Sequence, residues 1–128
     1  MRVTAAFSRL LALPEVWVRE VAFEPGVVVV SIVLRRRLLI CPLCSHTTSA
    51  RYDTRPDAST WRHLDLGIWR LEVRAPLARL RCPTHGVVTE GVPFARAGSR
   101  FTRDFEDLVG YLATTADKAT IGRLLRID

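Results

Sequence analysis

Two short turns carry the residues of this sequence that are best suited to chemistry. Cys41 and Cys44 are separated by two residues, as are Cys82 and His85, and the two turns use all 3 cysteines and one of the 3 histidines. A two-residue spacer lets two side chains of a tight turn reach the same ion, and two such turns complete a tetrahedral shell. The pattern predicts a structural Zn2+ ion held by the thiolates of Cys41, Cys44 and Cys82 and the imidazole of His85.

Other interpretations of these residues are weaker. The cysteines could instead be small buried apolar residues, with His85 a surface residue. Chance placement of that kind would seldom put every cysteine into two matched turns. A disulfide framework would leave one of the 3 cysteines unpaired, and no secretion signal precedes them. His46, two residues past Cys44, is a rival ligand, but a histidine in a loop is more often simply solvated.

An enzyme is not expected from these residues. Four protein ligands fill a zinc shell and leave no open position for a reacting water. Zinc deaminases need a His-x-Glu motif and a proline before their paired cysteines. Here proline follows Cys41, and neither His46 nor His63 has Glu two residues on. We therefore predict no catalytic residues and no small-molecule substrate.

The composition favours a nucleic-acid partner. The chain has 128 residues, 48% hydrophobic and 25% charged, which is typical of one globular domain. Its net charge is +6, and every one of the 19 basic residues except Lys118 is arginine. Such a surplus favours polyanions, and guanidinium groups match phosphate oxygens and guanine edges. A GC-rich genome, whose codons favour arginine, explains the bias equally well.

No membrane partner is expected. The most apolar run, Val27–Leu34, is followed by three arginines and is far shorter than the roughly 18 to 20 residues that span a bilayer. Ser8 and Arg9 interrupt the apolar N-terminal stretch, and no small-x-small cleavage site follows. We expect a cytoplasmic, nucleoid-associated protein.

The elements before the first turn must support it. Apolar residues at helical spacing within 1–14 predict a short helix that ends before Pro14. Runs of β-branched and aromatic residues at 16–23 and 27–34 flank a proline–glycine turn and predict a hairpin. Its second strand is expected to run through the arginine triplet directly into Cys41, because a strand end gives a metal-binding turn a firm support.

The second turn is expected at another strand end. Residues 45–60 predict a loop with a short strand near Tyr52. Apolar and charged residues alternate from Trp69, and Pro76 is expected to mark an edge or a bulge before the alternation resumes. This strand leads into Cys82, and Gly86 provides the turn that follows. Two hairpins that share one ion in this way form a zinc ribbon.

Two short helices are predicted after the ribbon. Thr102 is placed as an N-cap before an apolar stripe of helical period, and Asp117 is placed as the cap of a second helix. Helix, short turn and helix begin a helix-turn-helix, and the chain ends before a recognition helix. We thus predict an α+β chain with three parts: a helix and β-hairpin at 1–34, a zinc-ribbon domain at 35–97, and an incomplete helix-turn-helix at 98–128.

Five sequence stretches occur in an order that resembles a known protein family. They are Cys41–Cys44, Trp61–Leu66, Leu80–Gly86, Val92–Arg96 and Ser99–Leu108. They resemble the N-terminal region of the L-three family of bacterial insertion-sequence transposases. The similarity covers roughly residues 10–128 and is most specific from Arg81 to Leu108. In that family a zinc-binding domain comes first, a helix-turn-helix follows, and a catalytic domain with an acidic metal-binding triad comes last.

The resemblance implies recognition of the terminal inverted repeats of the element during DNA transposition, by a chain without the catalytic domain. Family zinc ligands correspond to the four residues that spacing had selected. Arginines around the two turns would neutralise phosphates and make binding depend on salt, although each one taken alone is more simply a solvated residue. The predicted contacts with double-stranded DNA are Arg35, Arg36, Arg37, Arg79, Arg81, Arg96, Arg100 and Arg103.

A protein-interaction module is the alternative. The zinc-stabilised ribbon would then dock on another transposase protomer, with Trp17, Trp61 and Trp69 as aromatic anchors. Core packing is the commoner role of such residues, because aromatic side chains dominate small cores.

Overall fold

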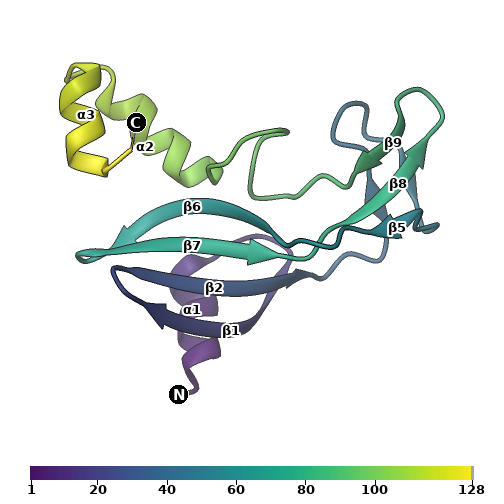
Figure 1. Ribbon diagram of the computed structural model, residues 1–128, viewed down its shortest axis with the longest axis horizontal. Coiled ribbons are helices and arrows are strands. Elements are labelled where there is room, and N and C mark those ends of the chain that lie inside the picture. The colour runs from purple at the N-terminus through teal and green to yellow at the C-terminus, as the bar shows by residue number, and fades with distance from the viewer. Residues whose placement is uncertain (128) are drawn as a thin grey trace.

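The apolar run at 27–34 forms a central strand of the main sheet in the computed structural model, which describes residues 1–127. The chain is α+β, as predicted, with a sheet-rich body and two helices near its C-terminal end (Figure 1). The elements in chain order are α1 (Val3–Leu11), β1 (Val16–Glu24), β2 (Val27–Leu34), β3 (Leu39–Ile40), β4 (Thr47–Thr48), β5 (Asp53–Thr54), β6 (Ser59–Leu66), β7 (Trp69–Ala75), β8 (Ala78–Cys82), β9 (Gly86–Thr89), α2 (Arg103–Leu112) and α3 (Lys118–Leu125).

The main sheet has the strand order β1-β2-β7-β6. β1 and β2 form the predicted antiparallel hairpin, β6 and β7 form a second hairpin, and the two hairpins join through the parallel pair β2–β7. The apolar strand β2 lies inside this sheet, where Val28, Val30 and Ile32 are fully buried. The predicted N-terminal helix is α1, whose Phe7 and Leu11 join the same core.

A smaller β unit lies at one end of the main sheet, on the right of Figure 1. It comprises the three-stranded sheet β5-β8-β9 and the two-stranded sheet β3-β4. Its core is separate from that of the main sheet and consists of Leu39, Cys41, Ala78, Leu80 and Cys82. The predicted short strand near Tyr52 is β5, which pairs with β8.

Two strand predictions need correction. The strand expected to run through the arginine triplet ends at Leu34, because Arg36 turns back to donate from Nη2 to the Gly91 carbonyl at 2.9 Å. The strand expected to continue across Pro76 is divided into β7 and β8, which belong to different sheets. Residues 35–97, predicted as one ribbon, therefore supply β6 and β7 to the main sheet as well as all strands of the smaller unit.

The helices α2 and α3 pack on the opposite end of the main sheet (Figure 1). Both predicted caps are confirmed: the Phe105 N–H donates to Thr102 Oγ1 and the Thr120 N–H donates to Asp117 Oδ1, at 3.3 and 2.7 Å. The segment before α2 lies along the β6 edge, where the Arg62 N–H donates to the Arg100 carbonyl. This edge of the sheet is thereby covered by its own chain.

None of the helices among residues 1–127 combines the length and apolar character that crossing a membrane requires.

Candidate metal centre

Both predicted ligand pairs lie at strand ends. Cys41 directly follows β3, and its turn is closed by hydrogen bonds from the Cys41 N–H to the His46 carbonyl and from the Ser45 N–H to the Cys41 carbonyl. Cys82 is the last residue of β8 and pairs with Gly86, whose φ of 74° permits the tight return into β9. The strands therefore fix the direction in which each pair of ligands points.

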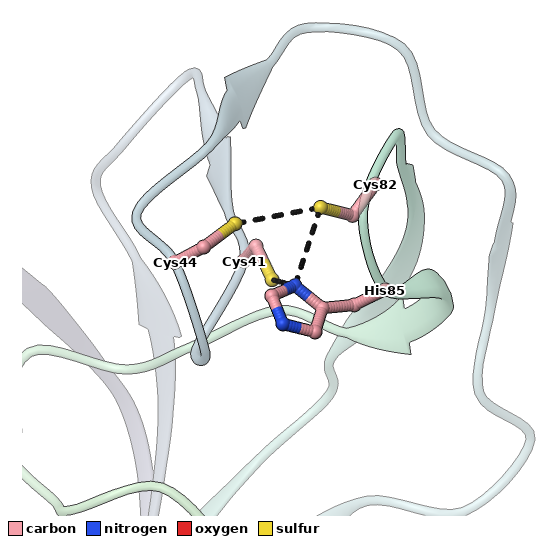
Figure 2. Close-up of side chains that lie close together, drawn as sticks. All are labelled: Cys41, Cys44, Cys82 and His85. Carbon is pink, nitrogen blue, oxygen red and sulfur yellow. Dashed lines mark hydrogen bonds between the residues drawn. The ribbon is translucent and has the colours of Figure 1, made fainter.

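The four side chains converge in space (Figure 2). Their ligand atoms all lie within 4.8 Å of one another. The Cys44 and Cys82 sulfurs are 3.4 Å apart, and His85 Nδ1 lies 3.7 Å from the Cys41 sulfur and 3.6 Å from the Cys82 sulfur. Tetrahedral zinc with Zn–S bonds of about 2.3 Å and Zn–N bonds of about 2.0 Å separates its ligands by roughly 3.5 to 3.8 Å. The arrangement therefore fits a tetrahedral metal ion bound through Nδ1.

The local electrostatics favour a thiolate at Cys82. Burial disfavours ionisation there, but the backbone N–H groups of His85 and Thr84 donate to the sulfur and lower its pKa to about 6. At Cys44 the backbone N–H of His46 lowers the pKa, whereas the hydrogen bond shared with Cys82 and the loss of solvent raise it, and the net shift is upward. Because the thiolate is the metal-binding form, Cys82 is the ligand best prepared for an ion.

The rival ligand His46 does not join this group of ligand atoms within residues 1–127. It contributes through its main chain, since its carbonyl accepts from Cys41 and closes the first turn.

Five of the eight predicted DNA-binding arginines interact with neighbouring side chains or backbone. The Arg79 guanidinium forms an ion pair with Asp53, which lowers the pKa of that carboxyl, and the Arg96 guanidinium pairs with Glu106 at 2.8 Å. Arg36 is bound to the Gly91 carbonyl, and Arg35 lies over the Trp17 ring at 5.1 Å. These residues already have structural roles in the folded chain.

Arg81 is the fifth, because its guanidinium lies over the Tyr52 ring at 5.3 Å. The other three predicted arginines are more available. Arg37, Arg100 and Arg103 are exposed, and their guanidinium groups have no hydrogen bond or ion pair to the described residues. The eight arginines thus do not form one uniform patch.

Sequence reasoning missed two arginines. Arg62 is 6% exposed and links β6 to the C-terminal helices, and the sequence pattern predicted no role for it. Arg55 lies in the loop before β6 and lines a cleft of about 570 Å³ beside the metal-binding turns. The only signal for Arg55 was its place in a polar, turn-rich segment, which is too weak to single it out.

The chain is similar to known transposases over part of their length. It is 37% identical over 97 residues, 76% of its own length, to the transposase for insertion sequence element IS1557 of Mycobacterium tuberculosis, in strain CDC 1551 / Oshkosh and in strain H37Rv. The matched stretch covers 21% of each relative, so the chain spans about a fifth of their length. No protein-family model and no solved structure matches the chain. The similarity shows homology to a segment of an insertion-sequence transposase.

Proposed function

We propose that this chain is a zinc-binding and DNA-binding module of an insertion-sequence transposase of the L-three family, and that it recognises the terminal inverted repeats of its element. The observation that carries the proposal is the convergence of Cys41, Cys44, Cys82 and His85 within a chain homologous to a transposase segment. Its partners are then double-stranded DNA and other transposase protomers, in the cytoplasm.

The metal proposed for this site is Zn2+, in a structural role. Three thiolates and one imidazole are a closed donor set that suits zinc, and they leave no coordination position for a substrate. The ion would join β3 to β8 across a core of only five buried residues, and the smaller unit would then be a zinc ribbon. We propose that the module itself binds DNA and performs no chemistry.

The helices α2 and α3 are assigned to the first part of a helix-turn-helix. They are joined by a short turn, each begins at a side-chain cap, and they share a core of Phe105, Ile121 and Leu125. Exposed Lys118 and Arg123 on α3 give this end of the molecule further positive charge.

A mobility-shift or fluorescence-anisotropy titration tests the DNA-binding proposal. The zinc-loaded chain is expected to bind a duplex that carries the terminal inverted repeat more tightly than a scrambled duplex, with an affinity that falls as salt rises. The proposal would be ruled out by a DNA affinity no better than millimolar at low salt, or by an affinity that does not change with salt concentration.

The protein-interaction alternative retains support from two of its three tryptophans. Trp17 is 58% exposed and Trp69 lies at the surface against Phe23, whereas Trp61 is buried against Phe94 with ring centroids 4.9 Å apart. The prediction of core packing is therefore wrong for Trp17 and correct for Trp61. Size-exclusion chromatography with light scattering distinguishes the functions, since a stable dimer without DNA affinity favours the alternative.

A further inference from the structure

A cleft of about 570 Å³ lies where the smaller β unit, the main sheet and the segment leading into α2 meet. Pro42 and Ser45 of the first metal-binding turn form part of its wall, and the beginning of β6 forms another part. Residues 95–99 complete it on the side of α2. In Figure 1 this segment is the green chain that passes over β6 between β9 and α2. The cleft is thus built from segments far apart in the sequence.

Four arginines from different segments line the cleft. Arg36 and Arg55 come from the segments before and after the first turn, Arg96 comes from the segment that leads into α2, and Arg103 is the first residue of α2. The single acidic residue in the wall is Glu90, whose carboxylate accepts from the Ala78 N–H at 2.8 Å. A cleft lined by charges of mostly one sign concentrates the electric field in its interior.

Two of these four arginines have no carboxylate partner within residues 1–127. Arg36 lies 3.5 Å from Glu15, and Arg96 pairs with Glu106. Among the described residues, the Arg55 guanidinium donates only to the neutral hydroxyl of Ser59, at 3.1 Å, and the Arg103 guanidinium has no hydrogen bond or ion pair. Arg55 and Arg103 are both exposed, so they are free to bind a ligand.

The lining chemistry is that of an oxyanion site. Hydroxyl groups of Ser45, Ser59 and Ser99 add neutral donors to the guanidinium groups. Arginine forks bind phosphate in a bidentate manner, which adds geometric specificity to the charge attraction. A volume of about 570 Å³ lies within the range of about 300 to 1,000 Å³ typical of ligand sites. It therefore admits a short piece of one strand and excludes a whole duplex.

We infer that this cleft binds backbone phosphates of one DNA strand, with Arg55 and Arg103, which come from different segments of its wall, contacting the strand. The inference rests on the proposed function and gives it a place on the molecule. It also changes which arginines matter: Arg55 becomes a principal contact, while Arg36 and Arg96 shape the cleft through their existing partners.

The test compares two double variants of the zinc-loaded full chain. Arg55→Ala/Arg103→Ala removes the two unpaired arginines of the cleft, and Arg9→Ala/Arg19→Ala removes two exposed arginines in α1 and β1 that do not line it. Each variant lowers the net charge by the same amount. Zinc content and circular dichroism establish that both are folded, and Arg55→Lys/Arg103→Lys retains the charge without the fork.

Fluorescence anisotropy with a labelled duplex at several salt concentrations gives the result. We expect the cleft variant to weaken binding by about tenfold or more and to reduce the salt slope by about 2, with the control within about twofold of the wild type. The lysine variant is expected to fall between them. A cleft variant that binds as the control does would overturn the inference and leave the proposed function standing.

Two further outcomes separate the possible failures. If the wild-type chain binds no duplex, the proposed function fails and the inference fails with it. A second titration uses inorganic phosphate alone, followed by thermal melting. If phosphate stabilises the wild type but the cleft variant still binds duplex normally, the cleft is a small-anion site and the strand-binding inference is wrong.

Discussion

Cys82 combines contacts to two other candidate ligands with backbone donors that favour its thiolate. Its sulfur lies 3.4 Å from the Cys44 sulfur and 3.6 Å from His85 Nδ1, and the backbone donors of its own turn stabilise its thiolate. His46 offers a contrast within the same site, because it closes the first turn through its carbonyl and leaves its ring unused.

Replacing Cys82 by serine is expected to abolish stoichiometric zinc binding, whereas His46→Ala is expected to retain one ion per chain. A hydroxyl does not supply the thiolate that the shell requires, and structural zinc sites contribute about 10 to 16 kcal/mol of apparent binding free energy to folding. Metal analysis by mass spectrometry, with a thermal melt, measures both effects. Unchanged zinc and unchanged folding in Cys82→Ser would refute the assigned site.

His63 is a second residue whose environment leads to a testable prediction, because burial changes the pKa of its imidazole. It is 4% exposed, and its Nδ1 lies 2.7 Å from the hydroxyl of Thr102. Burial lowers the pKa of His63 below 6.5, and the nearby charge of Asp104 opposes this shift only in part. The folded chain therefore holds this imidazole neutral at a pH where the unfolded chain protonates it.

The free energy of unfolding should consequently fall on acidification. Between the folded pKa and 6.5 the unfolded state binds more protons, so the contribution of His63 is complete above about pH 6.5 and is lost as the pH falls towards the folded pKa. Urea unfolding from about pH 7 to about pH 5 measures the slope. His63→Gln is expected to show a shallower slope, and the difference between the two slopes excludes the effects of groups that both chains share. Equal slopes would contradict this account.

At the scale of elements, β6 is attached to both C-terminal helices by one arginine. The Arg62 Nη2 group donates to Asp65 Oδ1 at 2.7 Å and to the Leu125 carbonyl at 2.8 Å, and its guanidinium lies 4.8 Å from the Phe105 ring centre. Asp65 also binds Arg126, at 2.5 Å. The orientation of α2 and α3 on the main sheet depends on this buried network.

Removing Arg62 should release the helices. Arg62→Ala is expected to cost about 3 kcal/mol, because it removes the buried cation that binds the half-buried Asp65 carboxylate and the buried Leu125 carbonyl. The matched change Arg126→Ala affects a more exposed partner of the same carboxylate and should cost less than about 1 kcal/mol. Urea denaturation gives the two values, and amide hydrogen exchange in α2 and α3 locates the loss. Similar values for both variants would show that the network does not hold the helices.

At the scale of the whole molecule, the core of the main sheet and the core of the smaller unit are separate and unequal in size, and α2 and α3 share a third core. The main core joins α1, the inner strands of the main sheet and Phe94, whereas the smaller unit has a core of only five residues that includes Cys41 and Cys82. A core so small does not offset the conformational entropy of the chain that it orders without an added cross-link.

Metal removal should therefore unfold one unit and leave the other. With a chelator, we expect residues 39–54 and 78–89 to lose their native amide signals in NMR spectra, while the core around Trp61 and Val73 keeps them. Added Zn2+ should restore the lost signals, and Cys82→Ser should resemble the chelated wild type. Cooperative loss of all signals would show that both cores depend on the ion.

Local features were predictable because neighbouring residues in the sequence determine them. The spacing of Cys41 and Cys44 forms one turn, a hydroxyl at Thr102 caps the helix that begins one residue later, and the apolar runs of β1 and β2 meet across a turn containing Gly26. Each depends on contacts within a few residues, so pattern and spacing are sufficient evidence.

Long-range pairing was decided only by the tertiary structure. The parallel pairing of Val28 with Leu71 joins two hairpins that the sequence leaves independent, and it separates β7 from β8 although their alternation is continuous. The same packing determines which arginines form an ion pair with a carboxylate and which arginines line the cleft. The sequence by itself thus determined the candidate ligands and the caps. The sheet and the cleft, where Arg55 and Arg103 have no carboxylate partner within residues 1–127, depend on segments that meet only in the folded chain.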